Sequence, residues 1–301
     1  MHTSRRHFLS LATAATVALS LRHVAFAADE STAQSLYPVN QCGKWGYIDR
    51  KGAMRIQPGF DIAWVFNENV APIKMGQQWS YIDRMGKEAF AARFDEARNF
   101  HNGLSPVRME DKWGFIKHDG SYGIPLQYDL ARSFQDDRAR VRVNGKWGYI
   151  QPDGSYTIQP LYDGANGYSE GVAPVQNDGK WGYIDKAGTM VIPMQFDTAE
   201  SFNEGLAAVK MGDTWGFISK TGKLVIPSRY EQAGEFSEGV CAVQSGGKWS
   251  FIDKSGKTTL SGGYDMADHF IEGLCAVKKG SLSMYLNHAG KTVWTSTATC
   301  G

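Results

Sequence analysis

Apolar and polar positions alternate in short runs along most of the chain, and one run returns at a fixed interval. Its clearest form, GKWGYID, begins at Gly43. Alternation over five or six residues is typical of β-strands. No segment keeps apolar residues at spacings of three and four for ten residues, as an amphipathic helix would. The pattern predicts an all-β chain, with helix expected at most in the N-terminal leader.

The interval is thirty-four residues, the distance from Trp45 to Trp79, and a tryptophan marks it. The residues that share this register are Trp45, Trp79, Trp113, Trp147, Trp181, Trp215 and Trp249, and an eighth register falls at Ser283. Counted from the tryptophan as position zero, an aromatic residue stands at +2 and a glycine at +7 in all eight copies. A period of this length indicates a repeat architecture, in which each unit packs on its neighbours. We predict a tandem array of eight units.

Each unit reads as a small antiparallel meander. The glycine at +7 follows an alternating run and indicates a hairpin turn, because glycine accepts positive φ. In the fifth copy this predicts strands over residues 181–185 and 189–193. A proline at +12 or +13 in five copies is expected to end the second strand, since it cannot donate to a ladder. An aromatic at +21 and a polar turn then lead to another apolar run.

The tryptophans have two interpretations. A buried tryptophan hides ~150–250 Å², and a constant register suits an interior seam. Alternatively, a row of exposed tryptophans would offer stacking platforms for sugar rings. We favour the core, because so short a unit, built of short strands, needs large buried side chains.

The repeated residues closely resemble those of the bacterial WG-repeat family. The shared features are Lys-Trp-Gly-Tyr-Ile-Asp, the glycine at +7, Val-Ile-Pro, Tyr/Phe-Asp-x-Ala and Phe-x-Glu-Gly-Leu, over residues 36–293. The resemblance implies an all-β repeat protein, often exported, and it transfers no catalytic residue. Ser80 and Ser250 depart from the pattern, because they replace the glycine after tryptophan.

The same unit could build an open or a closed array. We predict an open or superhelical solenoid, because the period is below the ~40–45 residues of a WD-type propeller blade. A closed, propeller-like toroid is the alternative. Cys42 and Cys300 lie outside the repeat register at opposite ends of the chain. They could pair only in a ring, since a disulfide needs Cα atoms within ~7 Å. Cys241 and Cys275 share position +26, where small buried residues are expected, and the pairing stays open.

Residues 1–27 resemble a twin-arginine signal peptide. Arg5 and Arg6 precede an apolar run over residues 8–21, and Ala25-Phe26-Ala27 predicts cleavage before Ala28. This run is too short to span a membrane, which needs roughly 20 residues. We expect a signal peptide (1–27), a short linker (28–35) and a repeat domain (36–301). The mature protein is expected to be periplasmic or secreted, without a membrane span.

The charge balance and the absence of catalytic motifs argue against several classes of function. The chain has 32 basic and 31 acidic side chains, so it lacks the overall positive charge that is typical of nucleic-acid-binding proteins. No nucleophile motif, phosphate loop or cluster of metal ligands is present, so we expect no enzyme, no cofactor and no metal. One acid at +16 per copy cannot supply the six or more oxygens of a calcium site. An Asx-type turn bond is the expected role of these aspartates.

One copy breaks the pattern most strongly. Arg138, Arg140 and Arg142 replace mostly apolar residues, and strand alternation places them on one side, with Ala139 and Val141 on the core side. Guanidinium groups match carboxylate and phosphate, so the stripe is a candidate anion site. A solvated strand face is the alternative. The further candidates are Arg108, Arg132 and Trp64, and Trp64 is expected to be exposed.

The expected function is non-catalytic binding or scaffolding in the cell envelope. The ligand would be a protein, a peptide or an envelope polysaccharide. A glycan-acting hydrolase or lyase with a site between repeats is the runner-up, and a structural spacer is the third possibility.

Overall fold

The computed structural model of the protein describes residues 35–296. The predicted signal peptide and Cys300 lie outside the described residues. Within them the chain forms thirty strands in eight antiparallel sheets, which confirms the predicted all-β meander of eight repeats. No helix in this part of the chain is long and apolar enough to cross a membrane.

The first two sheets have three strands each. They are β1 (Leu36–Gln41), β2 (Lys44–Asp49) and β3 (Met54–Phe60), then β4 (Ile62–Ala63), β5 (Val70–Met75) and β6 (Gln78–Asp83).

The next three sheets have four strands each. They are β7 (Glu96–Ala97), β8 (Ser105–Met109), β9 (Lys112–Ile116) and β10 (Tyr122–Tyr128); β11 (Leu130–Ala131), β12 (Ala139–Val143), β13 (Lys146–Ile150) and β14 (Tyr156–Tyr162); and β15 (Gly164–Ala165), β16 (Val172–Asn177), β17 (Lys180–Asp185) and β18 (Met190–Phe196).

The last three sheets repeat this order. They are β19 (Thr198–Ala199), β20 (Leu206–Met211), β21 (Thr214–Ser219) and β22 (Leu224–Tyr230); β23 (Gln232–Ser237), β24 (Val240–Ser245), β25 (Lys248–Asp253) and β26 (Thr258–Tyr264); and β27 (Met266–Ile271), β28 (Leu274–Lys279), β29 (Leu282–Asn287) and β30 (Thr292–Thr295).

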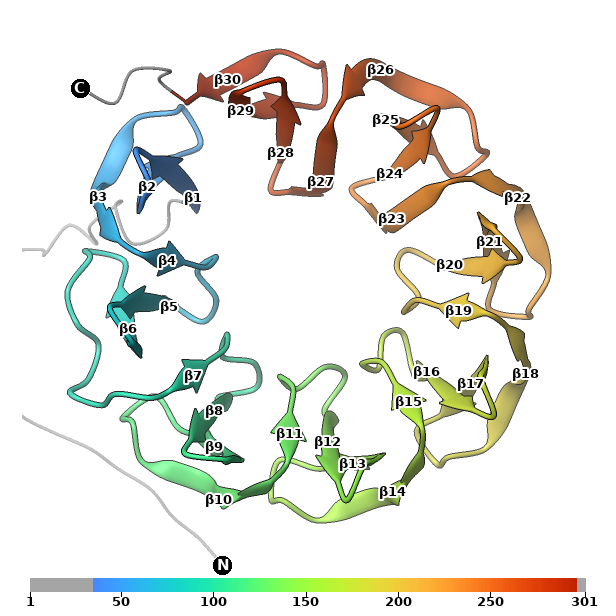
Figure 1. Cartoon of the computed structure of the whole chain (residues 1–301), viewed down its shortest axis with the longest axis horizontal. Coiled ribbons are helices and arrows are strands. Elements are labelled where there is room, and N and C mark those ends of the chain that lie inside the picture. Colours follow the sequence, from blue (N-terminus) through green and yellow to red (C-terminus); the bar gives the residue numbers. More distant parts are fainter. Residues whose placement is uncertain (1–34, 297–301) are drawn as a thin grey trace, which may run out of the picture. The chain divides into compact units, whose positions relative to one another are not determined.

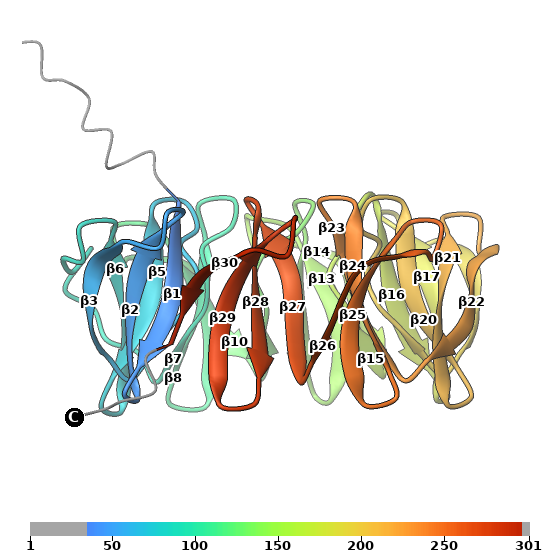
Figure 2. The same ribbon diagram turned by 90° about the horizontal axis from the view of Figure 1, so that it is seen from above.

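The eight sheets stand around a common centre as the blades of a β-propeller (Figure 1). The short strands that open each blade from β4 onward lie nearest the centre, and the strands that end the blades, such as β14 and β18, lie on the outer rim. Seen from the side, the blades form a flat ring (Figure 2). The prediction of an open solenoid was therefore wrong, and the closed alternative is the observed form.

Direct contacts close the ring between the last blade and the first. The Tyr37 hydroxyl donates to the carbonyl of Glu272 at 3.1 Å, and the Tyr285 hydroxyl donates to that of Pro38 at 3.0 Å. The two tyrosine rings pack edge to face, with centroids 5.6 Å apart. Leu274 is buried in the same cluster, so an apolar core spans the seam.

The innermost strand is very short in most blades, although β23 and β27 reach six residues within the same repeat period. In five blades this strand has two residues, as in β11. Six of the eight copies, counted from the tryptophan, give two strands to one blade and two to the next; the Trp113 copy, for example, supplies β9, β10, β11 and β12. Neighbouring blades therefore share one stretch of chain, which fixes their relative angle.

The predicted hairpin of the fifth copy is present as β17 and β18. Its proline does not end the second strand, however, because β18 continues through Pro193 to Phe196. The ladder shifts register between the pairs Trp181–Phe196 and Tyr183–Ile192. Proline is tolerated at such a bulge on an outermost strand, since no ladder bond needs its missing N–H.

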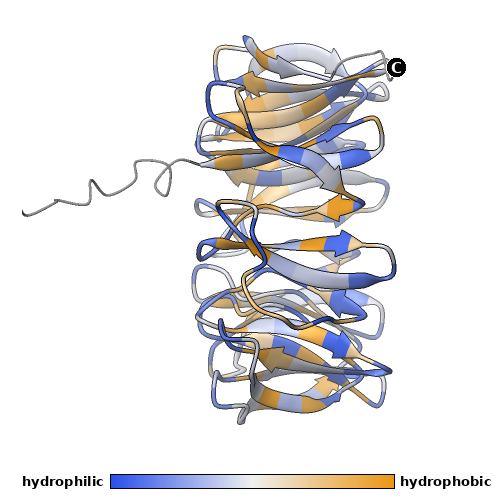
Figure 3. Cartoon of the chain, turned by 90° about the vertical axis from the view of Figure 1, so that its left-hand side faces the viewer, coloured by the Kyte–Doolittle hydropathy of each residue, from blue (hydrophilic) through white to orange (hydrophobic). Residues whose placement is uncertain are grey.

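The core lies between the blades. The aromatic residue at +2 meets the aromatic residue at +21 in seven copies, with centroids 4.7–5.4 Å apart. Such pairs contribute about 0.5–1.5 kcal/mol each beyond their buried area. Trp79, Trp113 and Trp215 are buried, and Trp45, Trp147, Trp181 and Trp249 are half-buried against the same clusters. Figure 3 shows the hydrophobic colour mainly on the strands.

The acids at +16 do not form the expected Asx turn. Asp129 pairs with the Lys112 ammonium at 2.7 Å, and its second oxygen accepts the backbone N–H of Asn144, fifteen residues on, at 2.8 Å. The equivalent acids Asp61, Asp163, Asp197 and Asp265 make the same two contacts. The N–H contact ties the start of the inner strand to the central hairpin of its own blade, and the lysine contact ties it to the preceding blade.

Candidate functional site

The three arginines of the stripe alternate with buried residues as predicted, but their side chains do not lie together. Ala139 and Val141 are fully buried, and the three arginines project from the other side of the strand. Arg138 belongs to the turn before β12, where its Nη1 donates to the carbonyl of Asp137. Arg142 is exposed beside Asp129. Only Arg140 reaches the inner wall of the ring, so the three side chains do not form one site.

Two other candidate residues have structural partners. Arg108 lies on β8, where its Nε donates to Glu96 at 3.0 Å and its Nη1 to the carbonyl of Glu110 at 2.5 Å. Trp64 is half-buried, not exposed as expected. Its ring packs against Trp79, with centroids 5.6 Å apart, and the Arg98 guanidinium covers it at 5.7 Å. Stacking between an indole and a guanidinium explains its partial burial.

The side chains at position +19, which follows the first two residues of each inner strand, differ from blade to blade. The backbone there is uniform: the N–H of Arg132 donates to the carbonyl of Arg140, as Glu200 does to Ala208. The tyrosine at +2 fixes the same residue from behind, since the Tyr183 hydroxyl donates to the carbonyl of Glu200 at 2.8 Å. We call this ring of residues the inner wall. Around it the side chains are Trp64, Arg98, Arg132, Asn166, Glu200, Gly234 and Asp268.

The basic sector of the inner wall consists of Arg98, Arg132 and Arg140. Burial, together with neighbouring guanidinium charges, lowers the pKa of Arg98 and of Arg140 to about 10. Burial also lowers the pKa of Arg132. Arg98 Nε, Arg132 Nη1 and Arg140 Nε are buried and have no hydrogen-bond partner among the described residues. This sector holds more positive charge and more N–H groups than the protein satisfies.

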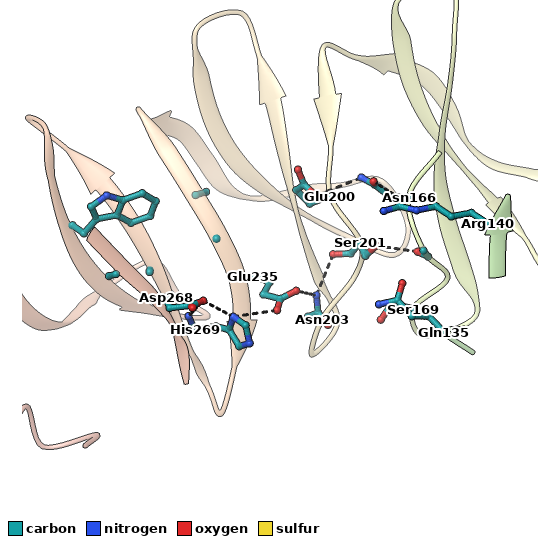
Figure 4. Close-up of a pocket in the computed structure, with 16 residues that line it drawn as sticks. Gln135, Arg140, Asn166, Ser169, Glu200, Ser201, Asn203, Glu235, Asp268 and His269 are labelled. Atoms are coloured by element: carbon teal, nitrogen blue, oxygen red, sulfur yellow. Dashed lines mark hydrogen bonds and ion pairs between the residues drawn. The ribbon is translucent and has the colours of Figure 1, made fainter. Parts of the chain in front are cut away.

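Arg140 is held firmly in place. Its Nη1 donates to the carbonyl of Ala165 and to Asn166 Oδ1, both at 2.5 Å, and its guanidinium lies 5.7 Å from the Trp147 ring. The Asn166 amide in turn donates to Glu200 Oε2 at 3.4 Å (Figure 4). Asn166 thus stands between the two opposite charges, and no direct ion pair joins Arg140 to Glu200 in the described chain.

The acidic sector follows in the next blades. Burial raises the pKa of Glu200, and the nearby Glu235 carboxylate adds to this, while Arg140 opposes it. Asn203 donates to Glu235 Oε2 at 2.9 Å. His269 Nδ1 lies 2.8 Å from Asp268 and 3.5 Å from Glu235. The hydrogen bond with Asp268 raises the pKa of His269 and lowers that of Asp268.

These side chains line one cavity of about 400 Å³ on the inner wall. It extends from Gln135 and Arg140 in the blade of β12 to Asp268 and His269 in the blade of β27, and Figure 4 shows the labelled side chains along it. Its volume falls in the range of about 300–1,000 Å³ for small-molecule sites. A second, more apolar cavity of about 640 Å³ lies at the seam beside β1 and β28.

One usable signal for this site was present in the sequence. Position +19, which singles out Trp64, also carries Arg98, Arg132, Asn166, Glu200 and Asp268. Glu235, Asn203 and His269 were missed, because residues at +20 and +22 look like ordinary polar turn residues. No group of three or more His, Cys, Asp or Glu within residues 35–296 could hold a metal ion.

The fold and the cavity define a repeat β-propeller with a ligand-sized site on its inner wall. The model of the WG containing repeat matches residues 45–79, 79–113, 113–147, 147–181, 181–215, 215–249 and 249–282. The chain therefore belongs to the WG-repeat family.

Solved structures share the fold at low sequence identity. "Dihydro-heme d1 dehydrogenase NirN in complex with DHE" superposes with a TM-score of 0.61 and 10% identity, over 87% of this chain and 73% of that one. A "eukaryotic initiation factor" gives 0.55 and 9%, over 87% and 84%. Hsv2 of Kluyveromyces lactis gives 0.50 and 9%, over 73% and 90%. Among curated protein sequences there is no match.

Proposed function

We propose that this propeller is a non-catalytic binding protein of the cell envelope, and that its ligand occupies the inner-wall cavity. The unpartnered Nε–H group of Arg140, the arginine of the basic sector that lines the cavity, carries the proposal. A buried polar group without a partner costs about 1–3 kcal/mol, and more when it is charged. A ligand with a carboxylate or phosphate would supply the missing acceptor, and arginine matches such groups well.

Turnover is the main alternative to binding. Glu200 has a raised pKa and shares the cavity with Glu235, and a carboxyl pair with different environments can act as general acid and base. This is the observation in favour of a glycan-acting hydrolase or lyase. Product release from envelope glycans would identify that enzyme, whereas saturable binding without products supports the binding function. A spacer would show neither.

A matched pair of variants on β12 tests the site. Arg140→Met and Arg142→Met each remove one guanidinium from the same strand, but only Arg140 lines the cavity. Envelope peptides and glycans are screened by isothermal titration against the purified mature protein. For each ligand found, we expect Arg140→Met to lower affinity at least tenfold, the value of one charged hydrogen bond, and Arg142→Met to leave it unchanged. Equal affinities in the two variants would show that the ligand does not bind in the cavity.

The proposal of an envelope location rests on residues 1–27. We expect the mature protein from the native host to begin at or near Ala28. Replacing Arg5 and Arg6 together by Lys should retain the precursor in the cytoplasm, because twin-arginine export depends on that pair. Fractionation and N-terminal sequencing make the measurement, and normal export of the double variant would contradict this route.

A further inference from the structure

The charges along the inner-wall cavity are sorted by sign. Arg140 stands at one end, in the blade of β12, with Arg132 and Arg98 behind it. Glu235 and Asp268 stand at the other end, in the blades of β23 and β27. Between the ends the wall carries neutral hydrogen-bonding groups, among them Asn166, Ser169 and Asn203. One blade, that of β15, separates Arg140 from Glu200, the first acid of the cavity, and at the far end His269 contacts both Asp268 and Glu235.

This arrangement excludes several ligand classes. A polyanion such as a nucleic acid would meet Glu200, Glu235 and Asp268 and be repelled there, and a polyamine would meet the arginines. Like charges brought together at an interface are strongly unfavourable.

We propose that the cavity binds a short peptide with both termini free, with its carboxylate on Arg140 and its ammonium group on Glu235. This assignment rests on the proposed function. The peptide amides would lie along Asn166, Ser169 and Asn203, which offer both donors and acceptors. An extended chain covers ~3.3–3.6 Å per residue, so a peptide of three or so residues spans roughly 10 Å and suits a cavity of about 400 Å³. The carboxylate gives Arg140 the acceptor that its Nε lacks.

The experiment compares the binding of free and capped peptides to the native protein and to three variants. Trialanine, N-acetyl-trialanine and trialanine amide are titrated calorimetrically into the mature protein and into Arg140→Met, Glu235→Gln and Arg142→Met. In the unmodified protein each cap should weaken binding roughly tenfold or more, because it removes one charged hydrogen bond. Arg140→Met should lose discrimination against the amide alone, and Glu235→Gln discrimination against the acetyl cap alone. Arg142→Met should keep both.

The outcomes separate the two proposals. If trialanine does not bind, or the capped peptides bind as well as trialanine, the peptide assignment is wrong. The proposed function then survives only if another ligand from the screen loses affinity in Arg140→Met. If every ligand found binds equally to Arg140→Met and Arg142→Met, the cavity is not the ligand site, and both proposals fail.

Discussion

At the scale of single residues, partial burial governs the charged side chains of the inner wall. Glu200 is half-buried, and its carboxylate has an amide hydrogen bond from Asn166 but no ion pair in the described chain. Burial therefore favours its protonated form and raises its pKa. On the other side of Asn166, burial and the neighbouring arginine charges act in the same way to lower the pKa of Arg140. In both sectors burial disfavours the ionised form of the side chain, and a bound group of opposite charge would stabilise that form.

The raised pKa of Glu200 gives a testable pH dependence. A group with a folded pKa above its unfolded value binds protons more tightly in the folded state. Its stabilising effect is complete below the unfolded pKa and is lost as pH rises through the folded pKa. Glu200→Gln removes this loss, so the variant should gain stability over the native protein as pH rises above about 4, the ordinary pKa of a glutamate.

Urea denaturation at several pH values measures the difference. The exposed Asp213→Asn reports the general effect of removing one acid. A pH-independent difference between the native protein and Glu200→Gln would show that burial does not disfavour the ionised carboxylate.

The two free cysteines give a second prediction at this scale. Cys241 and Cys275 are buried free thiols, and burial raises the pKa of both, that of Cys275 to about 12. Because the thiolate is the reactive form, iodoacetamide at about pH 8 should leave both unmodified in the folded protein and alkylate both in guanidinium chloride. Mass spectrometry of the tryptic peptides checks this, and rapid alkylation of either thiol in the folded protein would contradict it.

At the scale of elements, the glycine after tryptophan, present in five copies, permits the close approach of the outer strand. A Cβ on Gly148 would lie 2.6 Å from the Ile158 carbonyl oxygen and 2.7 Å from the Pro160 nitrogen. Both are backbone atoms at the bulge of the outer strand, so neither can move aside easily. The two copies without this glycine differ there: Ser80 faces isolated bridges instead of a strand, and Ser250 faces a strand with two glycines, Gly262 and Gly263.

Gly148→Ala should therefore destabilise the protein by about 2 kcal/mol, near the upper part of the range for single substitutions. Gly59→Ala is the matched control, because it lies in the outer strand β3 and its Cβ would meet nothing nearer than 3.9 Å. Its effect should stay within about 0.5 kcal/mol. Chemical denaturation of both variants makes the comparison, and equal stabilities would show that the hairpin tolerates a side chain there.

The features of the elements that could be predicted from the sequence are the local ones. Alternation and the glycine at +7 predict strands and hairpins correctly, because both are local properties. The bulge at Pro193 was not predicted, since it depends on which strand is outermost. The site was predicted only in part: alternation assigns Arg140 to the polar side of β12. Its separation from Arg142 depends on how far each residue lies from the ring's inner edge, which no local pattern encodes.

At the scale of the whole molecule, ring closure is a property of the angle between blades, and repeat length alone does not determine it. One repeat period completes a blade whether the inner strand has two residues, as in β11, or six, as in β23. Eight copies then return the chain to its start, where Tyr37 and Tyr285 meet. The first blade differs from the others in one respect: within residues 35–296, no inner strand pairs with β1.

The repeat register indicates what completes that blade. Cys42 is disulfide-bonded, whereas Cys241 and Cys275 are free. The chain has one more cysteine, Cys300, which lies outside the described residues. In other copies the residue at −3 donates its N–H to the acid at +16, as Gly76 does to Asp61 at 2.6 Å. Cys42 holds position −3, and Cys300, counted from Ser283, holds +17, directly after the position of that acid.

We therefore predict a Cys42–Cys300 disulfide that fixes the end of the chain beside β1. Non-reducing peptide mapping should yield one linked peptide containing both cysteines within the monomer. Closing so long a loop stabilises by roughly 2–5 kcal/mol, so Cys42→Ser should lower the free energy of unfolding by that amount. Cys241→Ser is the control, because it removes a thiol that forms no disulfide. A Cys300 that reacts with iodoacetamide without reduction would contradict this pairing, and the closed ring would then rest on the contacts of Tyr37, Leu274 and Tyr285 alone.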